Sequence, residues 1–244
     1  MRVRLTNLLL GMEKIFLPFL FLLFSLLHFL KVYAMTKAWL KHFPPWTLKD
    51  VMDFLIFTDV VYLAILAVFN IMIGYALLIS RNLHQEPQGF GEVFIPLLAT
   101  FWMYVYNIIA VIHPPGNVLV VPREYLGLSV LAGMYVAIAG LVIALVAISD
   151  MRRSFSILVQ VRDIITSGLY RYVRHPIYCG HVITMFGFAL LDPRIYSILF
   201  VAIGIGLTFF RASLEERKLC QFSQEYRRYK QNTPFILPNF LSKR

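Results

Sequence analysis

The residues best suited to chemistry lie between two apolar segments in the second half of the chain. Ser156–Gly180 is rich in basic and aromatic side chains and contains Arg-His-Pro-Ile-Tyr at 174–178. Pro176 suits the first position of a helix, so we expect His175 near the N-cap, and Gly168 allows a backbone reversal before it. Such a helix start favours an anionic group, and tyrosine faces can bind a flat ring. A belt of Tyr and Arg at head-group depth explains the same residues equally well.

A second group of charged residues follows the last apolar segment directly. Arg211 and Glu215 stand at i and i+4 and share one helix face. Glu216 points about 100° away from Glu215, so one glutamate can face a pocket while the other faces solvent. A solvated helix with internal ion pairs is the alternative. Apolar and aromatic residues at 219, 222, 226 and 229 are predicted to form one face of the continuing helix.

The composition excludes a water-soluble domain. Of the 244 residues, 59% are hydrophobic and 15% charged, with a mean hydropathy of +0.71, whereas soluble domains carry about 25% charged residues. Aromatic residues make up 15% of the chain, which argues against disorder. Two cysteines without a CxxC pattern, and six histidines without HExxH, indicate neither a disulfide framework nor a metal site.

The net charge of +10 is concentrated in the second half. Residues 150–244 hold 14 Lys/Arg against 6 acidic residues. Beside apolar segments this excess favours cytoplasmic loops and contact with anionic membrane lipids over nucleic acid.

Apolar stretches long enough to span a bilayer predict the elements that position these residues. They are 15–34, 55–80, 93–112, 126–148, and a pair of 17-residue halves at 175–191 and 195–211. Asp192-Pro193-Arg194 between the halves is a turn signal. We therefore expect an all-α, polytopic transmembrane helix bundle with a C-terminal helical hairpin and a cytoplasmic helix extension. We divide it into 1–120, N-terminal transmembrane helices without an assigned role, and 121–244, which carries the pocket.

The distribution of Lys and Arg predicts the orientation. Placing the N-terminus, 81–91, 150–174 and the C-terminal tail inside puts 17 Lys/Arg in the cytoplasm and 6 outside, as the positive-inside rule requires. The chain is then a multi-pass integral membrane protein whose pocket faces the cytoplasm. Alternatively, Met1–Ala34 is a signal peptide with a cleavage site at 32–34, but its apolar run exceeds the usual 7–15 residues.

The motif Thr166–Gly180, with Arg-His-Pro-Ile-Tyr-Cys-Gly at 174–180, is followed by Arg211, the paired glutamates and Glu225–Tyr229. Together these residues resemble the isoprenylcysteine carboxyl methyltransferase family of integral membrane methyltransferases, with phospholipid methyltransferases as neighbours. The resemblance covers residues 156–238 and does not extend to 1–120.

The resemblance implies S-adenosyl-L-methionine as the cofactor. By motif, the residues that would line its pocket are Gln160, Arg162, Asp163, Ile164, Ile165, Tyr170, His175, Pro176, Ile177, Tyr178 and Glu215. Arg211 would orient the acceptor, and a carboxylate acceptor held bidentately needs no general base. An amine acceptor would need one, for which Glu216 is the candidate. The choice between Glu215 and Glu216 for the pocket stays open.

The acceptor that the resemblance implies is lipidic or prenylated, as in O-methylation of an isoprenylcysteine carboxylate. A phospholipid amine and a small thiol are alternatives within the same chemistry. A sterol-reductase-like enzyme that uses NADPH is a different enzyme class with a similar C-terminal region. A non-catalytic membrane scaffold or transporter, whose aromatic and basic loop only binds head groups, is the third class.

Overall fold

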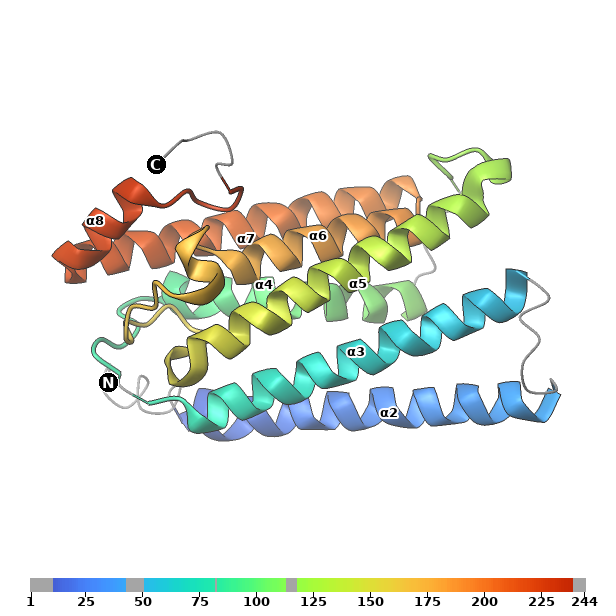
Figure 1. The fold of residues 1–244 in the computed structure, drawn as a ribbon, viewed down its shortest axis with the longest axis horizontal. Coiled ribbons are helices and arrows are strands. Elements are labelled where there is room, and N and C mark those ends of the chain that lie inside the picture. The colour runs from blue at the N-terminus through green and yellow to red at the C-terminus, as the bar shows by residue number, and fades with distance from the viewer. Residues whose placement is uncertain (1–10, 43–50, 82, 113–117, 239–244) are drawn as a thin grey trace.

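The computed structural model describes residues 11–42, 51–81, 83–112 and 118–238. Six long helices run alternately up and down (Figure 1). They are α2 (Leu17–His42), α3 (Val51–Ile79), α4 (Phe90–Ile112), α5 (Leu126–Met151), α6 (Pro176–Leu191) and α7 (Ile195–Phe222). The short elements are a π-helical turn η1 (Met12–Phe16), 3-10 turns η2 (Arg123–Tyr125), η3 (Arg152–Ser154) and η4 (Gly168–Arg171), and the helix α8 (Gln224–Asn232).

Four helices of the described residues are long and apolar enough to cross a membrane. Their spans are Glu13–Ala38, Val60–Ile79, Arg123–Met151 and Ile195–Phe222, and Phe90–Tyr106 and Pro176–Leu191 are shorter apolar helices. The predicted all-α polytopic bundle is thus confirmed. Residues 152–175, α8 and the start of α2 lie at one end of the bundle (Figure 1), which we call the loop end.

The C-terminal hairpin forms where the Asp-Pro pair predicts it. Helix α6 ends at Leu191, α7 begins at Ile195, and residues 118–120 brace the turn, with Val120 N donating to Pro193 O at 2.9 Å. Helix α7 has 28 residues and is therefore about 42 Å long, more than the roughly 30 Å of a hydrocarbon core. Its last turns project at the loop end as the predicted extension.

The predicted apolar face across 219–229 is not continuous. Ser223 has extended backbone (φ −129, ψ 128) and separates α7 from α8, and its side chain accepts a hydrogen bond from Tyr226 N. A serine at this position is a favourable N-cap, so a new helix starts in a different direction. As a result Leu219 lines the cavity described below from α7, while Tyr226 and Tyr229 line it from α8.

Small residues let α5 and α6 pack with their backbones in close contact. A Cβ atom added to Gly140 would lie 2.6 Å from Gly180 O and 2.5 Å from Thr184 N, and one added to Gly187 would lie 2.4 Å from Ala137 N. Close approach at small residues is the usual basis of helix association in membranes. This contact fixes the position of α6, whose first turn carries His175 and Tyr178.

We expect Gly140→Val to separate α5 from α6 and to lower the free energy of unfolding by about 1–3 kcal/mol, the usual cost of overpacking. Thermal unfolding in detergent measures the effect. Gly206→Val on α7 is the matched control, because a Cβ atom at Gly206 meets nothing within 4 Å. Equal unfolding temperatures for the two variants would contradict this packing.

Candidate functional site

A cavity lies at the loop end of the bundle. Its walls come from α3, α4, α5, α6, α7, α8 and the segment 154–165, which we call the pocket loop. Most of the predicted site residues line this one cavity: Gln160, Arg162, Asp163, Ile164, Ile165, Tyr170, His175, Ile177, Tyr178, Arg211 and Glu215. The others, Pro176 and Glu216, are not among its lining residues.

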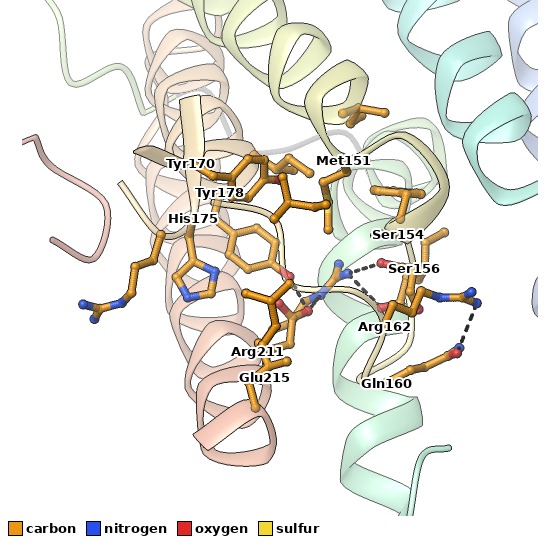
Figure 2. Close-up of a pocket in the computed structure, with 18 of the residues that line it drawn as sticks. Met151, Ser154, Ser156, Gln160, Arg162, Tyr170, His175, Tyr178, Arg211 and Glu215 are labelled. Carbon is orange, nitrogen blue, oxygen red and sulfur yellow. Dashed lines mark hydrogen bonds and ion pairs between the residues drawn. The ribbon is translucent and has the colours of Figure 1, made fainter. Parts of the chain in front are cut away.

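Arg211 forms the polar centre of the cavity (Figure 2). Its Nε lies 3.1 Å from Glu215 Oε1, its Nη1 donates to Thr100 Oγ1 at 2.9 Å, and its Nη2 donates to Ile157 O at 2.8 Å. The guanidinium carbon stands 5.2 Å from the ring centre of Tyr178, a cation–π distance. Tyr178 Oη in turn donates to Glu215. The ion pair of the buried Arg211 and the half-buried Glu215 is therefore neutral overall and is held by several further contacts.

The first turn of α6 presents aromatic rings to the cavity. His175 is the N-cap residue and Pro176 occupies the first position, as expected. The His175 ring stacks on Tyr178, with ring centres 5.3 Å apart and an interplanar angle of 14°. Backbone bonds from Arg174 N to Pro234 O (2.9 Å) and from His175 N to Phe235 O (3.1 Å) tie this turn to the segment after α8. The C-terminal segment thus holds the helix start in place.

Glu216 points away from the pocket, into a cluster of cations. Its carboxylate lies 2.6 Å from Arg174 Nε, 2.7 Å from Lys230 Nζ and 3.3 Å from His175 Nε2. Both carboxylate oxygens are therefore paired. Of the two adjacent glutamates, the structure places Glu215 on the cavity wall and Glu216 in the contact between α6, α7 and α8.

A tight turn closes the cavity beside α5. Gly168 has a positive φ of 61°, the region that glycine occupies most easily, as the expected backbone reversal requires. A Cβ atom there would also lie within 2.6 Å of three carboxyl atoms of Asp150. The Asp150 carboxylate accepts a hydrogen bond from Leu169 N at 2.8 Å. This turn places the Tyr170 side chain in the cavity wall.

Buried tyrosines form one side of the cavity. Burial raises the pKa of Tyr170 well above its usual value and raises the pKa of Tyr229 to about 12. Both phenols are therefore neutral at physiological pH. Tyr229 Oη donates to Tyr170 O and links α8 to the turn. Neutral aromatic faces of this kind attract a cationic or flat ligand.

Glu13, on the π-helical turn before α2, holds the pocket loop from behind. Its side chain is 2% exposed, and its Oε1 accepts from Ser156 Oγ (2.8 Å), Ile157 N (2.8 Å) and Leu158 N (3.1 Å). Gln160 Nε2 donates to the other oxygen. One carboxylate thus satisfies two backbone N–H groups of the pocket loop, whose carbonyls bind Arg211.

Arg162 carries an unpartnered donor at the loop end of the cavity. Its Nη1 donates to Arg81 O at 2.7 Å and its Nη2 to Gln160 Oε1 at 3.2 Å. Among the residues that the structure describes, Arg162 Nε is the buried side-chain nitrogen without a hydrogen-bond partner. Burial lowers the pKa of this guanidinium, and the charges of Glu13 and Asp163 act in the opposite direction. A buried donor of this kind calls for an acceptor, which a ligand in the cavity can supply.

The N-terminal part of the chain contributes site residues that no motif in the sequence marks. Thr100 and Ile73 lie within long apolar stretches, and Glu13 precedes one, so nothing in their surroundings marks them. His181 is different, because it stands three residues after Tyr178 and therefore shares its face of α6. That spacing was the available signal for a further polar lining residue.

The fold and the cavity define a polytopic α-helical membrane protein with a polar site at one end of the bundle. Residues 128–224 match a family model described as phospholipid methyltransferase. Over 74 residues the chain is 37% identical to methanethiol S-methyltransferase 1 of Bradyrhizobium diazoefficiens, covering 30% of this chain and 25% of that relative. The chain thus matches about a quarter of the length of this relative.

These two similarities support a family of membrane methyltransferases, as the motif implies. Both matches are named for methyltransferases, the enzyme class that the motif implies. The matched region includes α5, α6 and α7, which contribute Tyr178, Arg211 and Glu215 to the cavity.

We expect Glu13→Ala to destabilise the pocket loop strongly. Each buried donor left without a partner costs about 1–3 kcal/mol, so removal of the carboxylate should lower the unfolding free energy by at least about 2 kcal/mol. Glu124→Ala is the matched control, since Glu124 is exposed. Chemical denaturation in detergent gives both values. A Glu13 variant as stable as the Glu124 variant would show that this bracing is absent in the folded protein.

Proposed function

We propose that the chain is an S-adenosylmethionine-dependent methyltransferase and that the cavity around Arg211 and Glu215 binds the cofactor. The observation that carries the proposal is the convergence of three kinds of group on one cavity: the aromatic face of Tyr178, the carboxylate of Glu215 and the unpartnered nitrogen of Arg162. This set matches the chemistry of a ligand that is at once cationic, anionic and aromatic.

Each group has a counterpart in the cofactor. Arg162 Nε can donate to the α-carboxylate, and Glu215 can pair with the α-ammonium. The neutral faces of Tyr170 and Tyr178 can hold the sulfonium and the adenine. S-adenosylmethionine supplies an activated methyl group. The chain's residues align it with the acceptor and exclude water, and alignment alone can contribute about 7–11 kcal/mol.

The geometry favours an acceptor that does not have to bind the guanidinium of Arg211. Arg211 Nε, Nη1 and Nη2 each have a partner in Glu215, Thr100 or Ile157. A carboxylate acceptor would have to displace one of them, whereas a thiol would not. The relative named methanethiol S-methyltransferase also points to sulfur. We therefore propose an apolar thiol as the acceptor.

An isoprenylcysteine carboxylate is the second candidate. It is favoured by the position of Arg211, which is buried in α7 and lines the cavity wall, because a guanidinium can hold a carboxylate bidentately. A phospholipid amine is the third candidate. The base considered for it, Glu216, is paired with Arg174 and Lys230 outside the cavity lining.

We also propose that the loop end faces the cytoplasm. The basic segment 150–174 and helix α8 gather at this end (Figure 1), and cytoplasmic loops are those enriched in Lys and Arg. Cofactor would then enter from the cytosol, and an apolar acceptor from the lipid.

Purified protein should bind S-adenosylmethionine, and both Glu215→Gln and His175→Ala should weaken binding at least tenfold, about 1.4 kcal/mol. The first change removes the charge that pairs with the ammonium, and the second removes the ring that stacks on Tyr178. Isothermal titration calorimetry measures the affinities. Glu225→Gln, an exposed glutamate on α8, should bind as the wild type does. If neither pocket variant lost affinity, this cavity would not be the cofactor site.

Membranes that contain the protein should transfer label from S-adenosyl-[methyl-3H]methionine to an added alkanethiol, because a thiol requires no rearrangement of Arg211. The label should appear as a volatile or organic-extractable thioether. Label in a base-labile ester would instead identify a carboxylate acceptor, and label in phospholipid an amine. Protein with Glu215→Gln serves as the low-activity control.

A further inference from the structure

His181 is a polar side chain of the cavity to which neither the motif nor the matches assign a role. It lies on α6 one turn deeper in the bundle than Tyr178, and it lines the cavity. Its ring contacts aromatic groups: Phe69 of α3, edge-on at 5.8 Å between ring centres, and Tyr178 at 6.4 Å. Within the described part of the chain, no hydrogen bond to its ring nitrogens is found.

The surroundings of His181 hold its imidazole in the neutral form. The charged neighbour is Arg211 of α7, which is paired with Glu215, while α4 and α5 present Thr100 and Ile148 at the cavity. No carboxylate faces the ring as a counter-ion among the described lining residues near it, and an unpaired buried charge is costly. A neutral imidazole has one ring nitrogen with a free lone pair. That lone pair is open to whatever occupies the cavity.

A thiol acceptor creates a need for such a group. The thiolate is the nucleophilic form, and apolar surroundings raise the pKa of a thiol, so the acceptor enters this region protonated. Glu215 is bound by Arg211 and Tyr178, and Glu216 lies among cations outside the cavity. His175 is held against Glu216 at the loop end. His181 is therefore the base best placed to receive the thiol proton.

We propose that His181 binds the acceptor thiol and takes its proton as the methyl group moves. The proposal rests on the thiol methyltransferase activity proposed above. The S–H bond breaks and its proton passes to the free ring nitrogen, while the thiol sulfur forms a bond to the methyl carbon. The bond between that carbon and the sulfonium breaks, and its electron pair stays on the sulfur of S-adenosylhomocysteine. The sulfonium loses its positive charge as the imidazole gains one, so the total charge in the cavity does not change during the transfer. The imidazolium then gives its proton to water at the loop end.

The position of His181 also defines the chemical class of the acceptor. Ile73 of α3 and Ile148 of α5 line the same cavity and are buried in the helix bundle. A ligand whose sulfur reaches the imidazole therefore places its carbon chain against aliphatic side chains. This arrangement fits a thiol with an apolar carbon chain and excludes thiols whose carbon chain carries a charged group, because that charge would be buried without a partner.

Reaction rates with two thiols of different acidity show whether His181 acts as a base or only supports the structure. We expect His181→Gln and His181→Phe to lower kcat/KM for an alkanethiol by at least about 100-fold, the usual range for general-base catalysis. For an arylthiol that is already ionised at the assay pH, kcat/KM should fall by less than about threefold, because no proton has to be removed. Affinity for S-adenosylmethionine should remain within about twofold of the wild type, since His181 would touch the acceptor. His28→Gln on α2, whose ring Nδ1–H donates to Phe24 O, is the matched control and should leave the rates with both thiols unchanged.

The arylthiol reaction shows in the same sample that each variant is folded. Equal losses for the two thiols, or no loss for either, would overturn the role of His181. Failure of the proposed function is visible earlier, in the wild type: a protein that binds no S-adenosylmethionine or methylates no thiol contradicts that function and removes the basis of this inference. A wild-type protein that is active on thiols, with a His181 variant equally active on both, overturns the role of His181 alone.

Discussion

The ion pair between the buried Arg211 and Glu215 is the interaction on which the site depends. A guanidinium inside an apolar bundle is tolerated only when its charge is offset and its N–H groups are bonded. Glu215 offsets the charge, and Thr100 and the carbonyl of Ile157 accept the remaining bonds. These partners come from α7, α4 and the pocket loop. The partners that Arg211 requires therefore bring three separate parts of the chain together at a single cavity.

The same requirement gives the N-terminal helices a place in the site. Ile157 can offer its carbonyl to Arg211 because its own N–H group, like that of Leu158, is bound by Glu13. The pocket loop is thus held between a carboxylate before α2 and a guanidinium on α7. The family match begins only at residue 128, yet the cavity wall includes Thr100 and the brace includes Glu13. The pocket is a property of the whole bundle.

Local signals in the sequence were sufficient for the helices and for the C-terminal part of the site. Pro176 marked the start of α6, the Asp-Pro pair at 192–193 marked the hairpin, and the resemblance placed most lining residues in one cavity. The break at Ser223 was not predicted, because the apolar period continues through it and capping was decided by a single side chain. The contact of Glu13 with the pocket loop could not be predicted for a different reason. Its partners lie more than 140 residues away along the chain, and no pattern in a single sequence indicates such a contact.

We infer that the pocket loop, the start of α6 and the charged part of α7 enclose one sulfonium-donor site. An experimental structure of the detergent-purified protein with S-adenosylhomocysteine tests it most directly. We predict that the ligand lies in the cavity, with its amino-acid end between Arg162 and Glu215 and its adenine against the tyrosines. Ligand density elsewhere, or a structure in which His175 and Glu215 face separate sides of the molecule, would contradict the account.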